Sequence, residues 1–224
     1  MANGPRPDLH RPSRRHLLLL AAAAAAGFSP AEAIAQTIRR TPGQILGPFY
    51  PVQKPVDQDA DLTTVAGRRG RADGQIIEVL GRVINRRGEP VPGARIEIWQ
   101  ANTRGRYTHS SDRNTAALDP NFEGYAHLTT DVEGRYRFRS IKPGAYPEDS
   151  GTLRAPHIHF DVLGRSNRLV TQMYFAGEPL NDSDRVIQTA AANRHRLIVP
   201  FERVDTSSAD EALVGSWDIV LDEG

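Results

Sequence analysis

Short apolar segments, each ended by turn residues, recur along the chain from residue 76 onward. In residues 94–99, Ala94, Ile96 and Ile98 alternate with Arg95 and Glu97. This period of two is typical of a β-strand with one buried face. The same pattern predicts strands over residues 76–84, 94–99, 125–130, 135–141, 157–163, 168–175, 196–199 and 216–221.

Turn residues between these segments indicate the fold class. Residues 131–134 are Asp-Val-Glu-Gly, and residues 143–144 are Pro-Gly. Many short strands with Gly and Pro at the turns predict an all-β fold, most simply an antiparallel β-sandwich. At most one or two short helices are expected, around residues 182–193. Residues 36–75 lack a clear period and predict an irregular N-terminal arm, followed by a β-sandwich domain over residues 76–224.

The first 35 residues have the pattern of an export signal. An apolar run over residues 17–26 follows the Arg-Arg pair at 14–15, and Ala-Ile-Ala at 33–35 provides a cleavage site. Such a run is too short to span a bilayer. The pattern predicts a twin-arginine signal peptide over residues 1–35 and a periplasmic or extracellular mature protein without a membrane span. The alternative is a buried alanine-rich helix, but the alanine run has no amphipathic stripe.

Composition narrows the function classes. Of the 224 residues, 39% are hydrophobic and 25% are charged, which is the balance of a globular domain and not of a disordered or multi-span membrane chain. The formal net charge is +1, so no nucleic-acid partner is expected. The chain contains no cysteine, which excludes disulfides, iron–sulfur clusters and thiol catalysis.

The most specific candidate for a functional site is the segment Arg-Ala-Pro-His-Ile-His at residues 154–159. On a strand, His157 and His159 face the same side, while Ile158 points into the core. Two imidazoles on one face form a natural pair of metal ligands. The alternative is that His157 and His159 are two exposed polar residues that bind no metal, because these would show the same spacing.

Two tyrosines are further candidate ligands. Tyr107 ends Gly-Arg-Tyr at 105–107, and Tyr146 follows Pro-Gly-Ala at 143–145. Loops of this kind at strand ends are where binding sites are usually built. Each tyrosine could instead be a core or rim residue whose hydroxyl is hydrogen bonded. The residues alone leave both alternatives open.

Together with the surrounding motifs, these residues resemble the intradiol ring-cleavage dioxygenases, in particular the protocatechuate 3,4-dioxygenase group. The resemblance covers roughly residues 41–221 and rests on the combination of motifs. The motifs are Gly-Arg-Val at 81–83, Glu-Ile-Trp-Gln-Ala-Asn at 97–102, Gly-Arg-Tyr at 105–107, Leu-Asp-Pro-Asn-Phe at 118–122, Ile-Lys-Pro-Gly-Ala-Tyr-Pro at 141–147, Arg-Ala-Pro-His-Ile-His-Phe at 154–160 and Thr-Gln-Met-Tyr-Phe at 171–175.

The resemblance implies a transthyretin-like (prealbumin-like) β-sandwich enzyme that cleaves a catechol between its two hydroxylated carbons with O2, giving a cis,cis-muconate. It implies a non-haem Fe(III) cofactor, whose ligands would be Tyr107, Tyr146, His157 and His159. Arg154 matches an arginine beside the bound substrate, and Gln172 matches an active-site glutamine outside the ligand set. Tyr146 would leave the metal when the catechol binds and take one of its protons.

Alternatives follow from the same residues. The β-rich motifs are also similar to exported, non-catalytic binding or stalk modules of transthyretin-like or collagen-adhesin B-type fold, which have no use for Arg154, His157 and His159. Copper or zinc could occupy the same ligands, although paired phenolates favour Fe(III).

If Glu148 points inward, it would repel an anionic ring substituent. Neutral catechols are then expected to react at least as well as protocatechuate, the default substrate. The sequence leaves the oligomeric state open, a homo-oligomer included.

Overall fold

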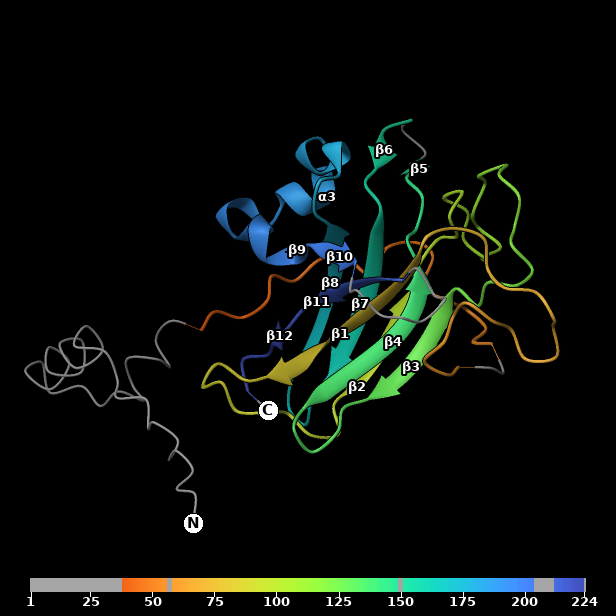
Figure 1. The fold of residues 1–224 in the computed structure, drawn as a ribbon. Helices are drawn as coiled ribbons and strands as arrows, with labels where there is room; N and C mark the ends of the chain where they lie inside the picture. The colour runs from red at the N-terminus through yellow and green to blue at the C-terminus, as the bar shows by residue number, and fades with distance from the viewer. Residues whose placement is uncertain (1–37, 56–57, 149–150, 204–211, 224) are drawn as a thin grey trace, which may run out of the picture. The chain divides into compact units, whose positions relative to one another are not determined.

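The alternating segments form two five-stranded sheets that pack against each other (Figure 1). The computed structural model describes residues 38–55, 58–148, 151–203 and 212–223. The predicted signal peptide over residues 1–35 lies outside these ranges. Arg39–Gly224 forms one compact unit.

The first sheet has the order β10-β11-β1-β12, and β4 also pairs with β1. Its strands are β1 (Ile76–Ile84), β4 (Arg135–Ile141), β10 (Phe201–Arg203), β11 (Leu213–Ser216) and β12 (Ile219–Val220). Both β11 and β12 run parallel to β1, so the sheet is mixed and not purely antiparallel as expected. The parallel pairs arise because long connections return the C-terminal strands to β1 in the same direction.

The second sheet has the order β3-β2-β7-β8-β9. Its strands are β2 (Arg95–Trp99), β3 (Tyr125–Thr129), β7 (His157–Leu163), β8 (Arg168–Phe175) and β9 (Ile198–Val199). A separate two-stranded ribbon is formed by β5 (Tyr146–Pro147) and β6 (Leu153–Arg154). Six of the eight predicted strands agree with the structure to within one residue, and two of these six, β2 and β3, are each one residue shorter than predicted.

The core lies between the two sheets and is built by the inward positions of the alternating strands. Phe138 of β4 and Phe160 of β7 meet there with their ring centroids 5.9 Å apart. Ile96 and Ile98 of β2 and Ile158 of β7 are fully buried beside them. The residues between them, including His157 and His159, therefore face the other side of the second sheet.

The strand predicted over residues 216–221 is interrupted at Trp217. The carbonyl of Trp217 passes so close to Gly81 that a Cβ atom on Gly81 would lie 1.9 Å from its oxygen. Tyr136 donates a hydrogen bond to this same carbonyl at 2.7 Å, and the indole of Trp217 packs against Phe160 at 5.0 Å. The predicted strand therefore begins on the last residue of β11 and corresponds mainly to β12.

The region expected to hold one short helix contains three short helical segments. They are η1 (Pro179–Asp182), α3 (Arg185–Gln188) and η2 (Ala191–Leu197). Because η2 continues through Leu197, the strand predicted over residues 196–199 is reduced to β9. Ala191, the first residue of η2, has a positive φ of 48°. No helix within the described part of the chain is long and apolar enough to cross a membrane.

The N-terminal arm is irregular, as predicted, and crosses the second sheet on the side away from the core. On this outer face, the side-chain amide of Gln172 donates to Ile45 O at 3.0 Å, and Tyr50 packs against Trp99 with ring centroids 5.0 Å apart. Further on, the amide of His127 in β3 donates to Gln58 O at 3.1 Å. The arm therefore covers the face of the sheet on which the candidate site residues lie.

Candidate active site

The register of the second sheet places two candidate residues, His159 and Gln172, in one row with Trp99. Trp99 of β2 lies opposite His159 of β7, and His159 lies opposite Gln172 of β8. His157, two residues earlier on the same face, lies opposite Tyr174. Strand pairing alone therefore fixes the spacing of the two histidines and of their neighbours.

The two histidines form a close, buried pair. Their Nε2 atoms are 3.2 Å apart, and the side chains are 2% and 1% exposed. Burial and the nearby Arg154 charge hold the pKa of His157 well below its usual value, and burial and His157 do the same to the pKa of His159. His157 Nδ1 bonds to Ala155 O at 2.6 Å, and we assign the proton to this nitrogen. The Nε2 lone pair of His157 is then free for a ligand.

Tyr107 and Tyr146 complete the group. Their rings are nearly perpendicular, with centroids 5.4 Å apart. The Tyr107 centroid lies 6.3 Å from that of His159, and the Tyr146 centroid lies 5.6 Å from that of His157. Burial raises the pKa of both hydroxyls, and the positive charge of Arg154 opposes this effect at Tyr146. The structure thus brings together all four residues that the sequence analysis singled out as metal ligands.

A glycine holds the two tyrosine loops together. Gly105 has a φ of +73°, and a Cβ atom at this position would lie 2.2 Å from Ala145 O. Only glycine permits this approach. The loop beyond it is fixed by Asp112, whose carboxylate accepts a hydrogen bond from the Tyr107 amide at 2.7 Å. Tyr107 and Tyr146 therefore meet although 39 positions separate them in the sequence.

The side chains present fit a metal ion with hard anionic ligands. The buried Tyr107 hydroxyl has no hydrogen-bond partner among the described residues, and a bound cation would satisfy it. In the same part of the chain, no group of three or more His, Cys, Asp or Glu side chains is placed to hold a metal. A metal here would need the phenol oxygens together with the two imidazoles. Such a mixed oxygen and nitrogen set suits Fe(III).

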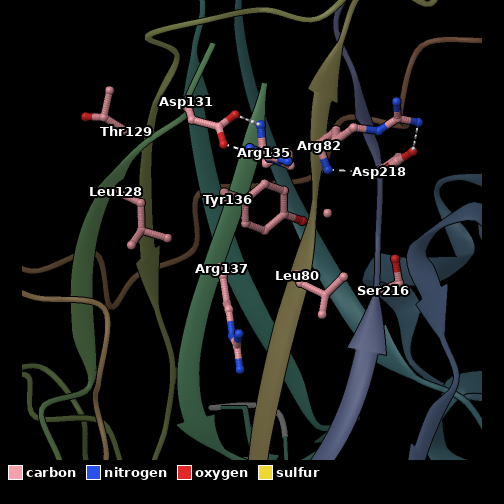
Figure 2. Close-up of a pocket in the computed structure, with 11 residues that line it drawn as sticks. Leu80, Arg82, Leu128, Thr129, Asp131, Arg135, Tyr136, Arg137, Ser216 and Asp218 are labelled. Carbon is pink, nitrogen blue, oxygen red and sulfur yellow. Dashed lines mark hydrogen bonds and ion pairs between the residues drawn. The ribbon is translucent and has the colours of Figure 1, made fainter. Parts of the chain in front are cut away.

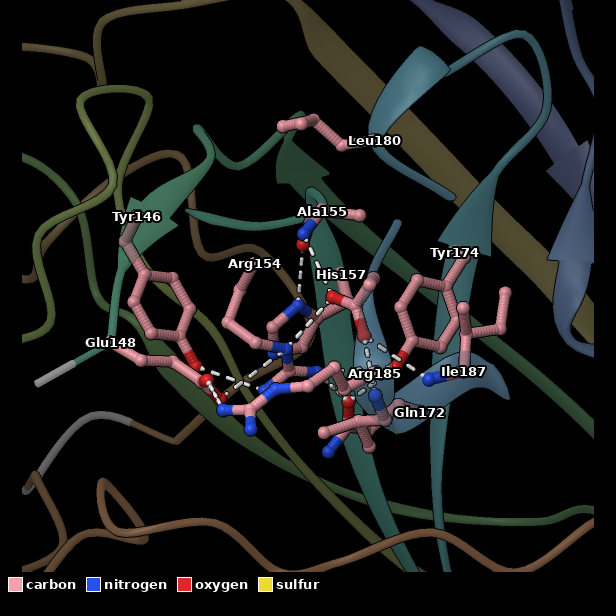
Figure 3. Close-up of polar contacts among 12 residues, drawn as sticks. Tyr146, Glu148, Arg154, Ala155, His157, Gln172, Tyr174, Leu180, Arg185 and Ile187 are labelled. Atoms are coloured by element: carbon pink, nitrogen blue, oxygen red, sulfur yellow. Dashed lines mark hydrogen bonds and ion pairs between the residues drawn. The ribbon is translucent and has the colours of Figure 1, made fainter. Parts of the chain in front are cut away.

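Arg154 lies beside this group in a dense network of polar contacts (Figure 3). Its side chain is 3% exposed. The terminal nitrogens donate to Tyr146 Oη at 3.3 Å, to Gln172 Oε1 at 2.7 Å and to Tyr174 Oη at 3.2 Å. Nε donates to Asp184 at 2.8 Å. The two other residues proposed from the sequence as catalytic, Gln172 and Tyr146, are thus both in contact with Arg154.

Three residues of the site were not predicted from the sequence: Tyr174, Asp184 and Phe49. The Tyr174 hydroxyl donates to Gln172 Oε1 at 2.8 Å, and strand alternation could have found it, because residues 172 and 174 share a face. Phe49 of the arm packs on Tyr107 and Tyr146, with ring centroids at 4.7 and 5.9 Å. No local pattern marks Phe49 or Asp184.

A cavity of about 580 Å³ adjoins the site. Tyr146 and Arg154 line it, together with arm residues 45, 48 and 49, loop residues 111–114, and Glu148 and Arg185. Among the described lining residues, Tyr107 and the two histidines do not appear. The volume lies within the range of small-molecule sites. Glu148 faces this cavity and is paired with Arg185 at 2.9 Å.

A second cavity, of about 650 Å³, lies over β1, β4 and β11, away from the candidate ligands (Figure 2). Arginines that line this cavity form ion pairs with nearby aspartates. Arg82 pairs with Asp218 at 3.0 Å, and Arg135 pairs with Asp131 at 2.7 Å. None of the candidate ligands or catalytic residues is among its described lining residues, whereas Tyr146 and Arg154 line the first cavity.

The chain is similar to known dioxygenases along most of its length. Residues 45–223 match the family model described as Dioxygenase. The chain is 46% identical over 179 residues to a protocatechuate 3,4-dioxygenase beta chain from Burkholderia cepacia, covering 78% of this chain and 76% of that protein. It is 32% identical over 196 residues to a catechol 1,2-dioxygenase from Candida albicans, covering 81% of this chain but only 60% of that protein.

A solved structure gives the same result for the fold. The dioxygenase domain of a dioxygenase carbohydrate-binding protein fusion from Streptomyces sp. SirexAA-E matches with a TM-score of 0.63 and 28% identity. The match covers 83% of this chain and all of that domain. These relatives favour an enzyme over the non-catalytic β-sandwich module considered as an alternative. The chain belongs to the intradiol ring-cleavage dioxygenase family.

Proposed function

We propose that this chain cleaves a catechol-type ring between its two hydroxylated carbons with O2, at a non-haem Fe(III) held by Tyr107, Tyr146, His157 and His159. The observation that carries the proposal is the meeting of two buried imidazoles, 3.2 Å apart at Nε2, with two buried phenols beside a cavity. The product is a cis,cis-muconate, whose two carboxylates come from the cleaved bond.

Ferric iron, when bound, would supply a Lewis acid that holds the deprotonated catechol and makes its ring reactive toward O2. The two tyrosines differ in what they can contribute. Tyr146 lines the cavity and can take a proton from an incoming hydroxyl group at its Oη atom. Tyr107 is not among the lining residues and is suited to stay in place as a permanent anionic ligand.

Arg154 contributes a fixed positive charge at the cavity wall. Its terminal nitrogens lie between Tyr146 and Gln172, so they would face a ring bound next to Tyr146. An arginine does not lose its proton at any working pH. It can therefore stabilise negative charge that develops on the ring as the bond to O2 forms.

Catechols are the substrate class that the relatives support. The Burkholderia relative is named for protocatechuate and the Candida relative for catechol. Glu148 lies in the cavity wall, where its carboxylate would oppose an anionic ring substituent, while Arg185 partly offsets that charge. Protocatechuate remains the default substrate, and neutral catechols are expected to react at least as well.

The decisive experiment combines an absorption spectrum, iron analysis and oxygen uptake on purified protein. Phenolate-to-Fe(III) charge transfer would give a reddish-brown colour with about one iron per chain. Colourless protein that takes up no oxygen with any catechol when supplied with iron would refute the proposal. A protocatechuate kcat/KM above every neutral catechol by about tenfold, or about 1.4 kcal/mol, would refute the substrate preference only.

We further infer that residues 1–35 direct export through the twin-arginine route. The support is the sequence pattern itself, with Arg-Arg at 14–15 and Ala-Ile-Ala at 33–35. Expression of the full chain in a Gram-negative host, followed by N-terminal sequencing of the periplasmic protein, should give Gln36 as the first residue. Replacing both arginines of the pair with lysine should leave the protein in the cytoplasm. Export of that variant at the normal rate would contradict the assignment.

A further inference from the structure

Asp184 is a fully buried carboxylate that lies next to the proposed active site without lining its cavity. It directly precedes α3, and its Oδ1 atom accepts hydrogen bonds from the amides of Val186 at 2.8 Å and Ile187 at 3.1 Å. This is the usual role of an aspartate at the start of a helix. Capping accounts for one of its two oxygens only.

The second oxygen is directed at the active site (Figure 3). Oδ2 accepts from Nε of Arg154 at 2.8 Å and from the amide of Ala155 at 2.8 Å. A single atom thus holds both the guanidinium and the backbone just before β7. The contact joins two segments that are 30 residues apart, so it is a tertiary contact and not part of the local turn.

Holding Nε fixes the direction in which the rest of Arg154 points. The guanidinium is planar, so once Nε–H is bound to Asp184 the terminal nitrogens can only lie in that same plane. In this orientation they reach Tyr146 at 3.3 Å and Gln172 at 2.7 Å. In Figure 3, Tyr146 and Tyr174 lie on either side of Arg154 with their hydroxyls directed toward it.

Asp184 is also the acid that compensates the buried charge of Arg154. The other nearby acid, Glu148, lies 3.9 Å from Nε and is already bonded to Arg185 at 2.9 Å. A buried guanidinium without a hydrogen-bonded acid would shift toward solvent or toward another partner. Glu148, at the cavity wall, would be the nearest one available.

We propose that Asp184 is a positioning residue of the ring-cleavage site, which holds the Arg154 guanidinium so that its terminal nitrogens face Tyr146 and the cavity. The proposal rests on the proposed function for its effect on turnover. The competing explanation is that Asp184 only caps α3 and fills the core. The two explanations differ in whether the effect of Asp184 passes through Arg154.

The variant Asp184→Ser separates these two roles. Serine is a good capping residue and can still accept from the amides of α3, but it has no second oxygen for Arg154. We expect bound iron and colour to stay at the wild-type level and kcat to fall by about tenfold or more, with KM changed by less than about threefold. In crystals of the variant, Arg154 should lose its hydrogen bond to Gln172.

A double-mutant cycle with Arg154→Ala tests the route of the effect. Once Arg154 is absent, adding Asp184→Ser should change the remaining kcat by less than about twofold. An equal loss in both backgrounds would show that Asp184 acts through the fold and would overturn the proposal. Wild-type kcat in Asp184→Ser, or loss of its iron, would overturn it as well.

Two further variants keep the test interpretable. The control is Asp131, which accepts hydrogen bonds from an arginine Nε and from two backbone amides, as Asp184 does, but lies on a distant turn. Asp131→Asn should leave kcat within about twofold of wild type. If Asp184→Ser does not fold, Asp184→Asn preserves the volume and is expected to give the same loss of kcat. An inactive wild-type protein would refute the proposed function. The position of Arg154 in crystals of Asp184→Ser would still test whether Asp184 holds the guanidinium.

Discussion

The imidazole of His159 is stacked on the indole of Trp99, with ring centroids 4.7 Å apart and ring planes 9° apart. The two residues are directly opposed in the register of β2 and β7. Gly47 of the arm also lies against this imidazole, because a Cβ atom on Gly47 would be 3.0 Å from His159 Cε1. The proposed ligand is thus oriented by the sheet and confined by the arm.

Gly47→Ala should weaken metal binding. Gly47 has a φ of +77°, so alanine adds both backbone strain and a contact with the His159 ring. Gly67→Ala is the matched control, since Gly67 has a φ of +79° but open space around it. Both variants should lose about 1–2 kcal/mol of unfolding free energy from strain. Only Gly47→Ala should also lose bound iron, measured by metal analysis after dialysis. Equal iron in both variants would contradict the confinement of His159.

Replacing proposed ligands should separate Tyr107 from Tyr146. Tyr107→Phe, His157→Ala and His159→Ala each remove one of four protein ligands and should lose most of the iron. Tyr146→Phe should keep more iron, because only Tyr146 of the two tyrosines lines the cavity, but should bind catechol more slowly because a proton acceptor is lost. Iron analysis and rapid-mixing spectroscopy measure these two effects. Full iron and activity in Tyr107→Phe would remove that residue from the ligand set.

The ion pair of Glu148 with Arg185 should govern which ring substituents are accepted. Glu148→Gln leaves Arg185 unpaired in the cavity wall. The ratio of kcat/KM for protocatechuate to that for catechol should then rise by about tenfold, and Arg185→Gln should lower it. Glu178→Gln, which breaks an ion pair with Lys142 away from the cavity lining, serves as the control. A ratio that stays constant in all three variants would exclude Glu148 from substrate selection.

The attachment of the arm should depend on pH through Glu97. Tyr50 and Lys54 of the arm both donate to the Glu97 carboxylate, at 2.5 and 2.6 Å. Burial raises the pKa of Glu97, but these two hydrogen bonds outweigh it, and the net pKa lies below the usual value of 4.5. The hydrogen bond to Glu97 raises the pKa of Lys54 above 10.5.

Stability from this cluster is therefore fully present above the ordinary pKa of a glutamate and is lost as the pH falls through the lowered pKa of Glu97. At alkaline pH it is lost as the pH rises through the raised pKa of Lys54. Glu97→Gln should cost about 1–3 kcal/mol of unfolding free energy at neutral pH, with the difference from wild type vanishing in acid. Denaturant unfolding at several pH values measures this. Glu78→Gln, on the other sheet, controls for loss of an acid, and a pH-independent difference for Glu97→Gln would contradict the prediction.

Strand alternation was sufficient to predict the part of the site that lies on one strand. His157 and His159 share a face because the period of a strand is two, and this holds whatever the rest of the chain does. Ring contacts from Tyr107 and Tyr146 could be anticipated only through resemblance, since their loops meet at Gly105 and Ala145 by tertiary packing.

Other features had no local signal. Asp184 reaches Arg154 across 30 positions, and before folding it resembles any aspartate at the start of a helix. The break at Trp217 depends on its contact with Gly81, which belongs to a strand more than a hundred residues earlier. Periodicity cannot report contacts between distant segments, so the strand predicted over residues 216–221 continued through the break and missed most of β11.

The two faces of β7 have a consequence for how metal and fold depend on each other. Ile158 and Phe160 are fully buried in the core, while the alternate positions 157 and 159 supply the proposed ligands. The imidazoles cannot separate unless the strand leaves the core, so an ion held by them binds the native state and not the unfolded chain. The melting temperature should then rise as the ferric ion concentration is increased. Calorimetry would therefore report the occupancy of the metal site without oxygen or a substrate.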